Sequence, residues 1–201
     1  MVLTRMMENY NLIAKQYAEG RMESRIGLKE LDDLLAKLPQ VAQILDFGAG
    51  TGKPITERIA QDPHQFKIFA VDSSVEMVKI FGENFPSIPI QCASILDFDF
   101  FSETFDAVVA WGVMFHLTET EQKSAIQRIS SALNNGGYFL FTSGNEAGMR
   151  SGAMFGVDFS YYSLGSENYR QTLAEQGMTL LSEHFGEGEN YYYLAQKHHK
   201  I

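Results

Sequence analysis

Short apolar runs alternate with helical windows along the middle of this 201-residue chain, and this alternation constrains the fold more than any other feature. Five runs have the length and composition of strands, at residues 43–47, 67–71, 88–93, 105–111 and 137–143. The helical windows between them cover residues 54–61, 75–84 and 119–133. Because a parallel connection needs about a dozen residues or more, this spacing predicts parallel strands with helices on both faces. The expected class is a doubly wound α/β fold.

The two flanking parts of the chain complete this plan. Residues 4–38 carry apolar side chains at helical spacing and predict two helices before the first strand. Residues 144–165 mix glycine, serine and aromatic residues without a clear period. A helix at 166–176 and two strands joined by a short Gly/Glu turn follow, so the last strand should be antiparallel. We expect one domain over residues 1–201, built on a Rossmann-like, mostly parallel seven-stranded sheet.

Composition and charge exclude several functional classes. With 16 Lys and Arg against 25 Asp and Glu, the net charge of -9 removes the general attraction to nucleic acids. Cys92 is the only cysteine, which excludes an internal disulfide and fits a reducing compartment. The first thirty residues lack the apolar core of a signal peptide, and no apolar run approaches the ~20 residues of a membrane span. We therefore expect a soluble, cytoplasmic protein without membrane or nucleic-acid partners.

The most informative window is ILDFGAGTG at residues 44–52, an apolar strand followed by an acid and three alternate glycines. Glycines allow the backbone to turn sharply and to approach a ligand beside the free N–H groups of the next helix. A phosphate-binding P-loop is excluded, because Phe47 and Pro54 occupy positions where that motif needs Gly and Ser or Thr. The dinucleotide fingerprint also fits poorly, since its third glycine would fall on Lys53.

This window resembles the first motif of the class I S-adenosylmethionine-dependent methyltransferases. Further matches follow in order: Asp72 ends the second strand, Ser94 and Ile95 follow the third, and Trp111-Gly112 follows the fourth. A Leu-Asn-Asn-Gly-Gly segment also precedes the fifth strand, with Asn135 where the family has Pro. The resemblance runs from about residue 10 to the end. It implies S-adenosyl-L-methionine as cofactor and methyl transfer, and it does not identify the acceptor. At 201 residues the chain leaves only the N-terminal arm and about twenty residues after the fifth strand to recognise an acceptor, which favours a small molecule.

The resemblance also implies a set of cofactor contacts. The glycine loop would face the methionine part, the acid before it the amino-group side, and the segments after the second and third strands the ribose and adenine. The backbone after the fourth strand would face the amino group, and an aromatic residue of the N-terminal helical lid at residues 1–38 would close over the cofactor. The implied residues are Tyr17, Asp46, Gly48, Ala49, Gly50, Gly52, Asp72, Ser73, Met77, Ser94, Ile95, Trp111 and Gly112.

Several of these residues have structural alternatives. Asp72 can accept both hydroxyls of a ribose, but it also precedes a helix that it could cap. Met77 and Trp111 could be ordinary core residues, and so could Tyr17 on its apolar helix face. Ser94 stands where many family members carry Asp for the adenine amino group, and a hydroxyl accepts that hydrogen bond more weakly.

Methyl transfer from a sulfonium is an in-line displacement, so few residues need be catalytic. A hydroxyl or acidic carbon acceptor calls for a general base, whereas a neutral amine does not. His116, at the end of the fourth strand, is the best candidate, and its alternative role is to cap the helix that begins near Thr118. The five histidines lack metal-ligand spacing with acids, so no metal site is expected.

We expect the acceptor site to be built from segments outside the sheet that lie at the carboxyl ends of its strands. These segments are the N-terminal lid, the substrate-side insertion at residues 144–165, and the turn at 186–190. These parts hold Glu187 and Glu189 and a set of aromatic residues, which suit a small apolar or cationic acceptor. The aromatic residues are Phe155, Phe159, Tyr161, Tyr162 and Tyr191. Two alternatives stay open: a non-catalytic module that binds S-adenosylmethionine, and another transferase that uses a related nucleoside.

Overall fold

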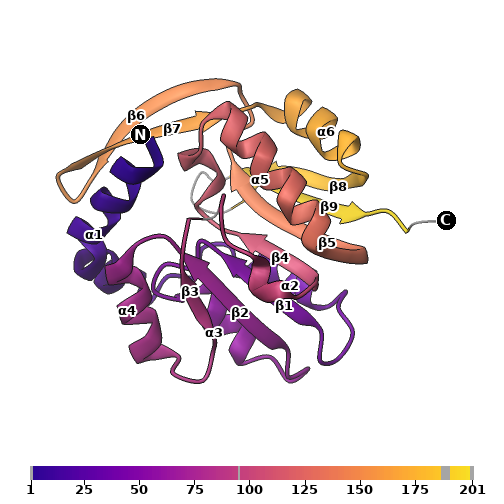
Figure 1. The fold of residues 1–201 in the computed structure, drawn as a ribbon, viewed down its shortest axis with the longest axis horizontal. Coiled ribbons are helices and arrows are strands. Elements are labelled where there is room, and N and C mark those ends of the chain that lie inside the picture. The colour runs from indigo at the N-terminus through magenta and orange to yellow at the C-terminus, as the bar shows by residue number, and fades with distance from the viewer. Residues whose placement is uncertain (1, 95, 187–190, 200–201) are drawn as a thin grey trace.

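A seven-stranded sheet forms the centre of the computed structural model, which describes residues 2–94, 96–186 and 191–199 (Figure 1). Its strand order is β3-β2-β1-β4-β5-β9-β8; β1 to β5 are parallel, and β9 is antiparallel to both of its neighbours. The predicted mostly parallel sheet with an antiparallel final strand is therefore confirmed. The strands are β1 (Gln43–Phe47), β2 (Lys67–Asp72), β3 (Ile90–Cys92), β4 (Phe105–Ala110), β5 (Leu133–Ser143), β8 (Met178–Phe185) and β9 (Tyr191–Lys197).

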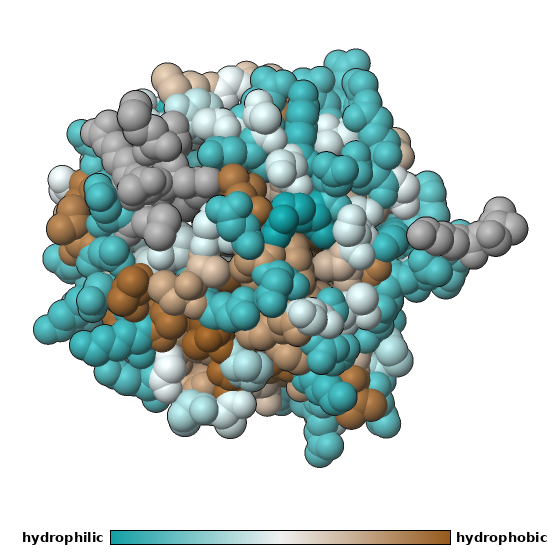
Figure 2. Space-filling view, viewed as in Figure 1, coloured by the Kyte–Doolittle hydropathy of each residue, from teal (hydrophilic) through white to brown (hydrophobic). Residues whose placement is uncertain are grey.

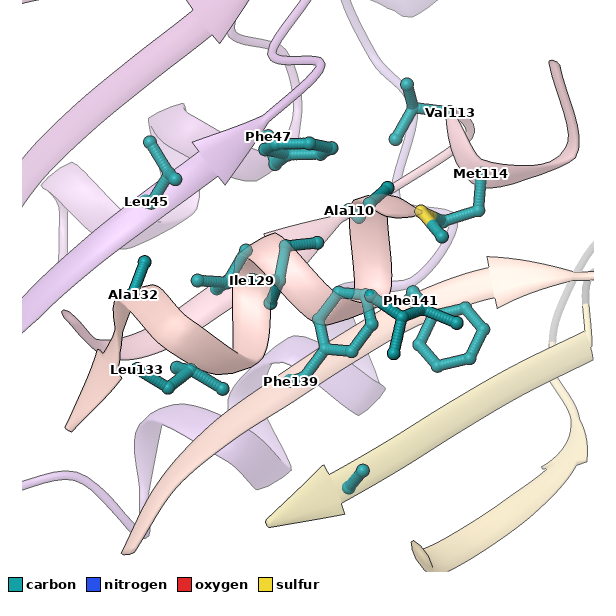
Figure 3. Packing of buried hydrophobic residues seen from close by; sticks show 14 of the residues in the cluster. Leu45, Phe47, Ala110, Val113, Met114, Ile129, Ala132, Leu133, Phe139 and Phe141 are labelled. Atoms are coloured by element: carbon teal, nitrogen blue, oxygen red, sulfur yellow. The ribbon is translucent and has the colours of Figure 1, made fainter. Parts of the chain in front are cut away.

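Helices cover both faces of this sheet, each over its own apolar cluster. One cluster joins α2 and α3 to one face, and the larger one joins α5 and α6 to the other face. Side chains alternate across a strand, so successive residues of β5 belong to different clusters. Leu140 packs in the cluster under α2 and α3, and Phe141 packs in the larger cluster under α5 and α6. Figure 3 shows part of the larger cluster, where Ile129 of α5 approaches Phe139 of β5. The helices are α1 (Val2–Arg21), α2 (Leu28–Leu35), α3 (Ile55–Ala60), α4 (Val75–Asn84), α5 (Glu119–Ala132) and α6 (Ser166–Glu175).

Local sequence signals fix where two of these helices begin. Ser74 caps α4, since its hydroxyl accepts a hydrogen bond from the backbone N–H of Met77 at 3.2 Å. Thr118 caps α5 in a capping box, in which the Glu121 carboxylate accepts from the Thr118 backbone N–H at 2.8 Å. Both caps lie just after strands whose carboxyl ends meet at one edge of the sheet.

Residues 144–165, for which the sequence showed no clear period, contain a β-hairpin in which β6 (Gly148–Met154) pairs with β7 (Val157–Ser163). Most of β6 is exposed, and an exposed strand needs no alternation of apolar residues that a sequence pattern could reveal. The hairpin reaches across to α1, where the Asn9 side chain donates a hydrogen bond to the Asp158 carbonyl at 2.8 Å (Figure 1).

Hydrophilic residues cover most of the face shown in Figure 2, and apolar residues gather mainly below its centre. Large exposed apolar side chains come from several separate elements, as is usual for a folded protein: Leu12, Met22, Val41, Val75, Met149, Phe155, Leu181 and Phe185. Within the described ranges, no helix combines the length and apolar character required to cross a bilayer.

Gly27 should be intolerant of substitution. It precedes α2 with a φ of 84°, and an added Cβ would overlap the ring of Trp111. Gly27→Ala should therefore lower the free energy of unfolding by about 2–4 kcal/mol, from the left-handed backbone and the clash together. The matched control is Gly82→Ala inside α4, which has open space for a methyl group and should stabilise by about 0.5–1 kcal/mol. Urea unfolding of both variants measures the difference; an unchanged Gly27→Ala variant would contradict this packing.

Candidate active site

A small pocket opens at the carboxyl ends of β1, β2 and β4, where parallel sheets of this kind bind their ligands. The structure brings together most of the predicted cofactor residues here, along with His116. The lining residues are Tyr10, Tyr17, Gly48, Gly50, Asp72, Ser73, Met77, Trp111, Gly112, Val113 and His116.

The glycine loop forms one wall of the pocket in a conformation that its glycines require. Gly48 has a φ of 83°, and an added Cβ would lie 2.7 Å from the Val113 side chain. Its backbone N–H and that of Ala49 donate hydrogen bonds to the Val71 carbonyl at 2.8 and 3.0 Å. These bonds hold the loop against the end of β2, so the glycine backbone itself faces the pocket.

Asp72 connects the glycine loop to the start of α4. Its Oδ2 accepts a hydrogen bond from the Gly50 N–H and its Oδ1 accepts one from the Ser74 N–H, each at 2.8 Å. Burial raises the pKa of this carboxyl, while the backbone donors lower it. Ser74 rather than Asp72 caps α4, so the capping alternative for Asp72 is wrong. Each carboxylate oxygen keeps a second lone pair, which leaves Asp72 able to accept from hydroxyls in the pocket.

Met77 and Trp111 are both core residues and pocket residues. Met77 is buried, and the Trp111 ring packs 4.8 Å from the Tyr192 ring, yet both line the pocket. Beside them, the Gly112 N–H donates to the Thr142 hydroxyl at 2.9 Å. That donor is therefore occupied; an ammonium group, which can only donate, would need the carbonyl oxygens of the 111–112 turn as acceptors.

Four predicted cofactor residues are not among the lining residues, and Ile95 lies outside the described residues. Asp46 is buried and its carboxylate accepts from the Thr56 hydroxyl at 2.5 Å. The Ser94 hydroxyl accepts from the Leu96 N–H at 3.3 Å within a turn. Gly52 has a φ of 83° and leaves room for the Phe85 ring, so packing explains this glycine. The fourth residue is Ala49.

His116 lies in the 3₁₀ turn Met114–His116 (η2) and is buried. Its Nε2 is 2.8 Å from the Tyr10 hydroxyl, whereas Nδ1 has no hydrogen-bond partner of good geometry in the described ranges. Burial lowers the pKa of His116 to about 4, against a smaller opposing effect of the Ser160 backbone, so the imidazole is neutral at physiological pH. Thr118 caps α5, which makes the capping alternative for His116 wrong.

Tyr10 and Val113 line the pocket although the sequence assigned them no role there. Helix α1 carries Tyr10 and Tyr17 on one face, with ring centroids 5.8 Å apart. The Asn11 amide oxygen fixes this helix to α4 by accepting from the Ser74 hydroxyl at 2.6 Å. The seven-residue spacing of the two tyrosines was the available signal, but it could not show that Tyr10 meets His116.

A second, larger cavity of about 610 Å³ lies beyond His116, between the end of β5, the β6–β7 hairpin and the start of β9. Three of the predicted acceptor-site aromatics line it: Tyr161, Tyr162 and Tyr191. Phe159 instead packs on Tyr10 and His116, Phe155 is exposed at the hairpin tip, and Glu187 and Glu189 lie outside the described residues. The rim carries Glu146 and Arg150, whose exposed side chains form an ion pair at 3.0 Å.

The electrostatics of the first pocket suit a cation. Its described lining contains no Lys or Arg, its histidine is neutral, and its carboxylate and two tyrosine rings favour positive charge. A pyrophosphate would meet no basic side chain there. Together, the Rossmann-like sheet, the glycine loop and the carboxylate after β2 define a nucleoside-binding transferase fold.

The described residues hold no cluster of three or more potential metal ligands.

Comparison with known proteins agrees with this class. Residues 44–137 match the family model "Methyltransferase domain". An uncharacterized methyltransferase of Anoxybacillus flavithermus is 29% identical over 98 residues, which are 49% of this chain and 45% of that protein. One of Schizosaccharomyces pombe is 33% identical over 98 residues, 49% of this chain and 37% of that protein. The chain thus spans about half or less of the length of these relatives, and the segment that it shares with them is similar to a methyltransferase domain.

Solved structures share the fold over nearly the whole chain. The 1,6-didemethyltoxoflavin-N1-methyltransferase of Burkholderia thailandensis, with bound 1,6-didemethyltoxoflavin and S-adenosylhomocysteine, superposes with a TM-score of 0.76 at 17% identity. That match covers 98% of this chain and 89% of the other. An S-adenosylmethionine-dependent methyltransferase of Clostridium acetobutylicum gives 0.73 at 18% identity, over 94% and 99% of the two chains. At these identities the likeness concerns the fold.

Asp46 should make stability depend on pH. Burial raises the pKa of its carboxyl from 3.8 to about 7, so the folded protein keeps a proton that the unfolded chain loses above pH 4. Relative to Asp46→Asn, the cofactor-free wild type should lose on the order of 4 kcal/mol of unfolding free energy as pH rises from 4 to 7.

The comparison must be made between variants, because His116 acts in the opposite direction. Its lowered pKa makes the folded state gain stability as pH rises from about 4 to 6.5, which partly hides the Asp46 effect in the wild-type curve alone. Urea unfolding of wild type and Asp46→Asn at several pH values separates the two. Parallel curves for the two proteins would show that Asp46 is ionised when folded.

Proposed function

We propose that this protein transfers a methyl group from S-adenosyl-L-methionine to a small-molecule acceptor through an O, N or C nucleophile, by in-line displacement. The observation that carries the proposal is the pocket at the strand ends, with its glycine wall, its Asp72 carboxylate and its lack of basic lining residues. These features fit a ligand that combines a ribose with a sulfonium and an ammonium group. The methyltransferase family match over residues 44–137 supports the same assignment.

Different pocket residues would contact different parts of the cofactor. Asp72 and Ser73 would accept from the ribose hydroxyls, Met77 would pack on the adenine, and the backbone of Gly48 and Gly50 would hold the methionine part. The carbonyl oxygens at 111–112 would accept from the ammonium, since the Gly112 N–H is already bonded to Thr142. Ser94 and Ile95 are proposed adenine contacts through the chain segment after β3, and Asp46 acts from behind the loop as a charge near the ammonium.

When bound, the cofactor supplies an electrophilic methyl group, and its sulfur keeps the electron pair of the broken C–S bond. The protein's own contribution is to align the acceptor, exclude water and receive a proton where the acceptor has one to lose. The rings of Tyr10 and Tyr17 cover the pocket from α1 and would face the sulfonium. His116 is the proposed proton acceptor, because it is buried, neutral and adjacent to both cavities.

The second cavity is the proposed acceptor site. Its aromatic lining and its single described ion pair, which is satisfied and exposed, suit a small neutral or cationic acceptor. The structurally similar Burkholderia thailandensis enzyme holds 1,6-didemethyltoxoflavin, and we infer an acceptor of comparable size here. The net charge of -9 argues against nucleic acid as acceptor, and the single cysteine fits a cytoplasmic location.

Isothermal titration calorimetry with S-adenosylmethionine and S-adenosylhomocysteine tests the cofactor assignment. Asp72→Ala should weaken binding about 100-fold, because two charge-assisted hydrogen bonds to the ribose are lost. The matched control is Asp33→Ala, which removes an exposed carboxylate of α2 that pairs with Lys29, and which should bind like wild type. Wild-type protein that binds neither ligand at millimolar concentration would refute the proposed function.

Turnover distinguishes an enzyme from a module that only binds the cofactor. Wild-type protein should convert S-adenosylmethionine to S-adenosylhomocysteine when supplied with an acceptor from a panel of phenols, alcohols, amines and carboxylic acids. His116→Asn should slow transfer to acceptors that lose a proton by about 10²-fold or more. Cofactor binding without transfer to any acceptor class would favour the non-catalytic alternative.

A further inference from the structure

Tyr10 stands between His116 and the open part of the pocket. Its hydroxyl is 2.8 Å from Nε2 of His116, and its ring packs against Phe159 and Tyr17 at centroid distances of 5.1 and 5.8 Å. It reaches this place from α1, which Asn11 fixes to the start of α4. The position of the phenol is therefore held by contacts on three sides.

The hydrogen bond between Tyr10 and His116 joins a phenol to a neutral imidazole. Burial raises the pKa of the Tyr10 phenol well above its usual range, and burial keeps the imidazole neutral, so one proton lies between the two groups. Nδ1 of His116 is buried and has no hydrogen-bond partner of good geometry among the described residues. The relay described below has the ring proton on Nδ1, so that Nε2 accepts from the Tyr10 hydroxyl.

This direction decides which atom can receive a proton from an acceptor. The lone pair of Nε2 is occupied by Tyr10, and Nδ1 already carries a proton. The free lone pair that faces the pocket belongs to the Tyr10 oxygen. A proton can therefore reach His116 only through the phenol.

We propose that Tyr10 is a catalytic residue that receives the proton of a hydroxyl acceptor and relays its own proton to His116, so that the natural acceptor is an alcohol or a phenol. This inference rests on the proposed function. As the acceptor oxygen takes the methyl group, its O–H proton passes to the Tyr10 oxygen and the Tyr10 proton passes to Nε2 of His116. When the product leaves, the Tyr10 proton passes to water in the pocket and the proton on Nε2 of His116 returns to the Tyr10 oxygen, so the phenol and the imidazole regain their starting states.

A buried relay of this kind serves a hydroxyl far better than an amine. An alkylated hydroxyl is strongly acidic and must lose its proton as the new bond forms, which calls for an acceptor atom within about 3 Å. A neutral amine can keep its proton until the product reaches water. The low basicity of the buried imidazole also favours quick release of the proton to solvent at neutral pH.

The titratable groups around the phenol are compatible with this role. Tyr17 and Arg21 face it from α1, Asp72 from the end of β2, and Tyr161 from β7. The Tyr161 ring lies 5.3 Å from His116 and also lines the second cavity. An acceptor in that cavity would therefore present its hydroxyl at the side of the pocket where Tyr10 and His116 meet.

The kinetic test compares wild type with Tyr10→Phe on phenols of graded acidity. With phenols that are un-ionised at the assay pH, the variant should lose 10²–10⁴-fold in kcat. With a nitrophenol that is already ionised, it should lose less than about tenfold, because no proton has to move. A merely structural role for Tyr10 would reduce both rates alike and would overturn the proposal. The matched control, Tyr138→Phe in the middle of β5, changes a tyrosine that lines neither cavity and should behave like wild type.

A second test does not depend on turnover. ¹⁵N NMR of the histidines, with His116→Asn to assign the signal, should show Nδ1 protonated and Nε2 unprotonated, both with and without S-adenosylhomocysteine. Tyr10→Phe should shift the Nε2 resonance while calorimetry shows that the cofactor still binds. Protonation at Nε2 would reverse the hydrogen bond and overturn the relay.

The outcomes separate this inference from the proposed function. Wild-type protein that binds the cofactor and methylates amines, or that leaves every phenol and alcohol unmethylated, overturns the hydroxyl assignment alone. Failure to bind either cofactor form refutes the proposed function itself.

Discussion

The pocket depends on one carboxylate. Asp72 accepts the N–H of Gly50 from the loop after β1 and the N–H of Ser74 from the start of α4, so it joins two segments that approach from neighbouring strands. Backbone N–H groups of this kind would repel one another if left to face an empty site. A buried carboxylate between them resolves this conflict, and the donors in turn oppose the effect of burial on its pKa. The two carboxylate oxygens of Asp72 thus hold the loop in place and are also the atoms proposed to bind the ligand.

The charges of the site form a consistent pattern around that carboxylate. His116 is kept neutral by burial, and no Lys or Arg is among the described lining residues; one cation, Arg21, lies over the Tyr17 ring at 5.1 Å from its centroid. Asp46 lies behind the glycine loop with a pKa near 7, which makes its charge sensitive to what occupies the pocket. A positive ligand lowers the pKa of a nearby carboxyl, so cofactor binding would favour ionisation of Asp46.

The sheet and much of the pocket were predictable because they follow from local patterns. Alternating strands and helices determine the topology, and a glycine loop placed after β1 must lie at the carboxyl edge beside Asp72. What local patterns cannot show is which side chain from a distant segment completes a site. Tyr10 meets His116 across 106 residues of sequence, and no periodicity of α1 contains that information. Gly52 shows the reverse, since packing against Phe85 accounts for a glycine that motif position alone had assigned to the cofactor.

Helix α1 connects the two halves of the proposed reaction. Asn11 ties it to α4 beside Asp72, while Tyr10, one residue earlier, contacts His116 at the border of the second cavity. Asn9 ties the same turn to β7 of the hairpin that walls that cavity. Three consecutive residues of one helical turn therefore contact the start of α4 beside the nucleoside pocket, the proposed proton acceptor His116, and the hairpin that lines the second cavity. A change in the position of this turn would therefore alter the wall of the cofactor pocket and the Tyr10–His116 hydrogen bond together, because the same few residues of α1 make both sets of contacts.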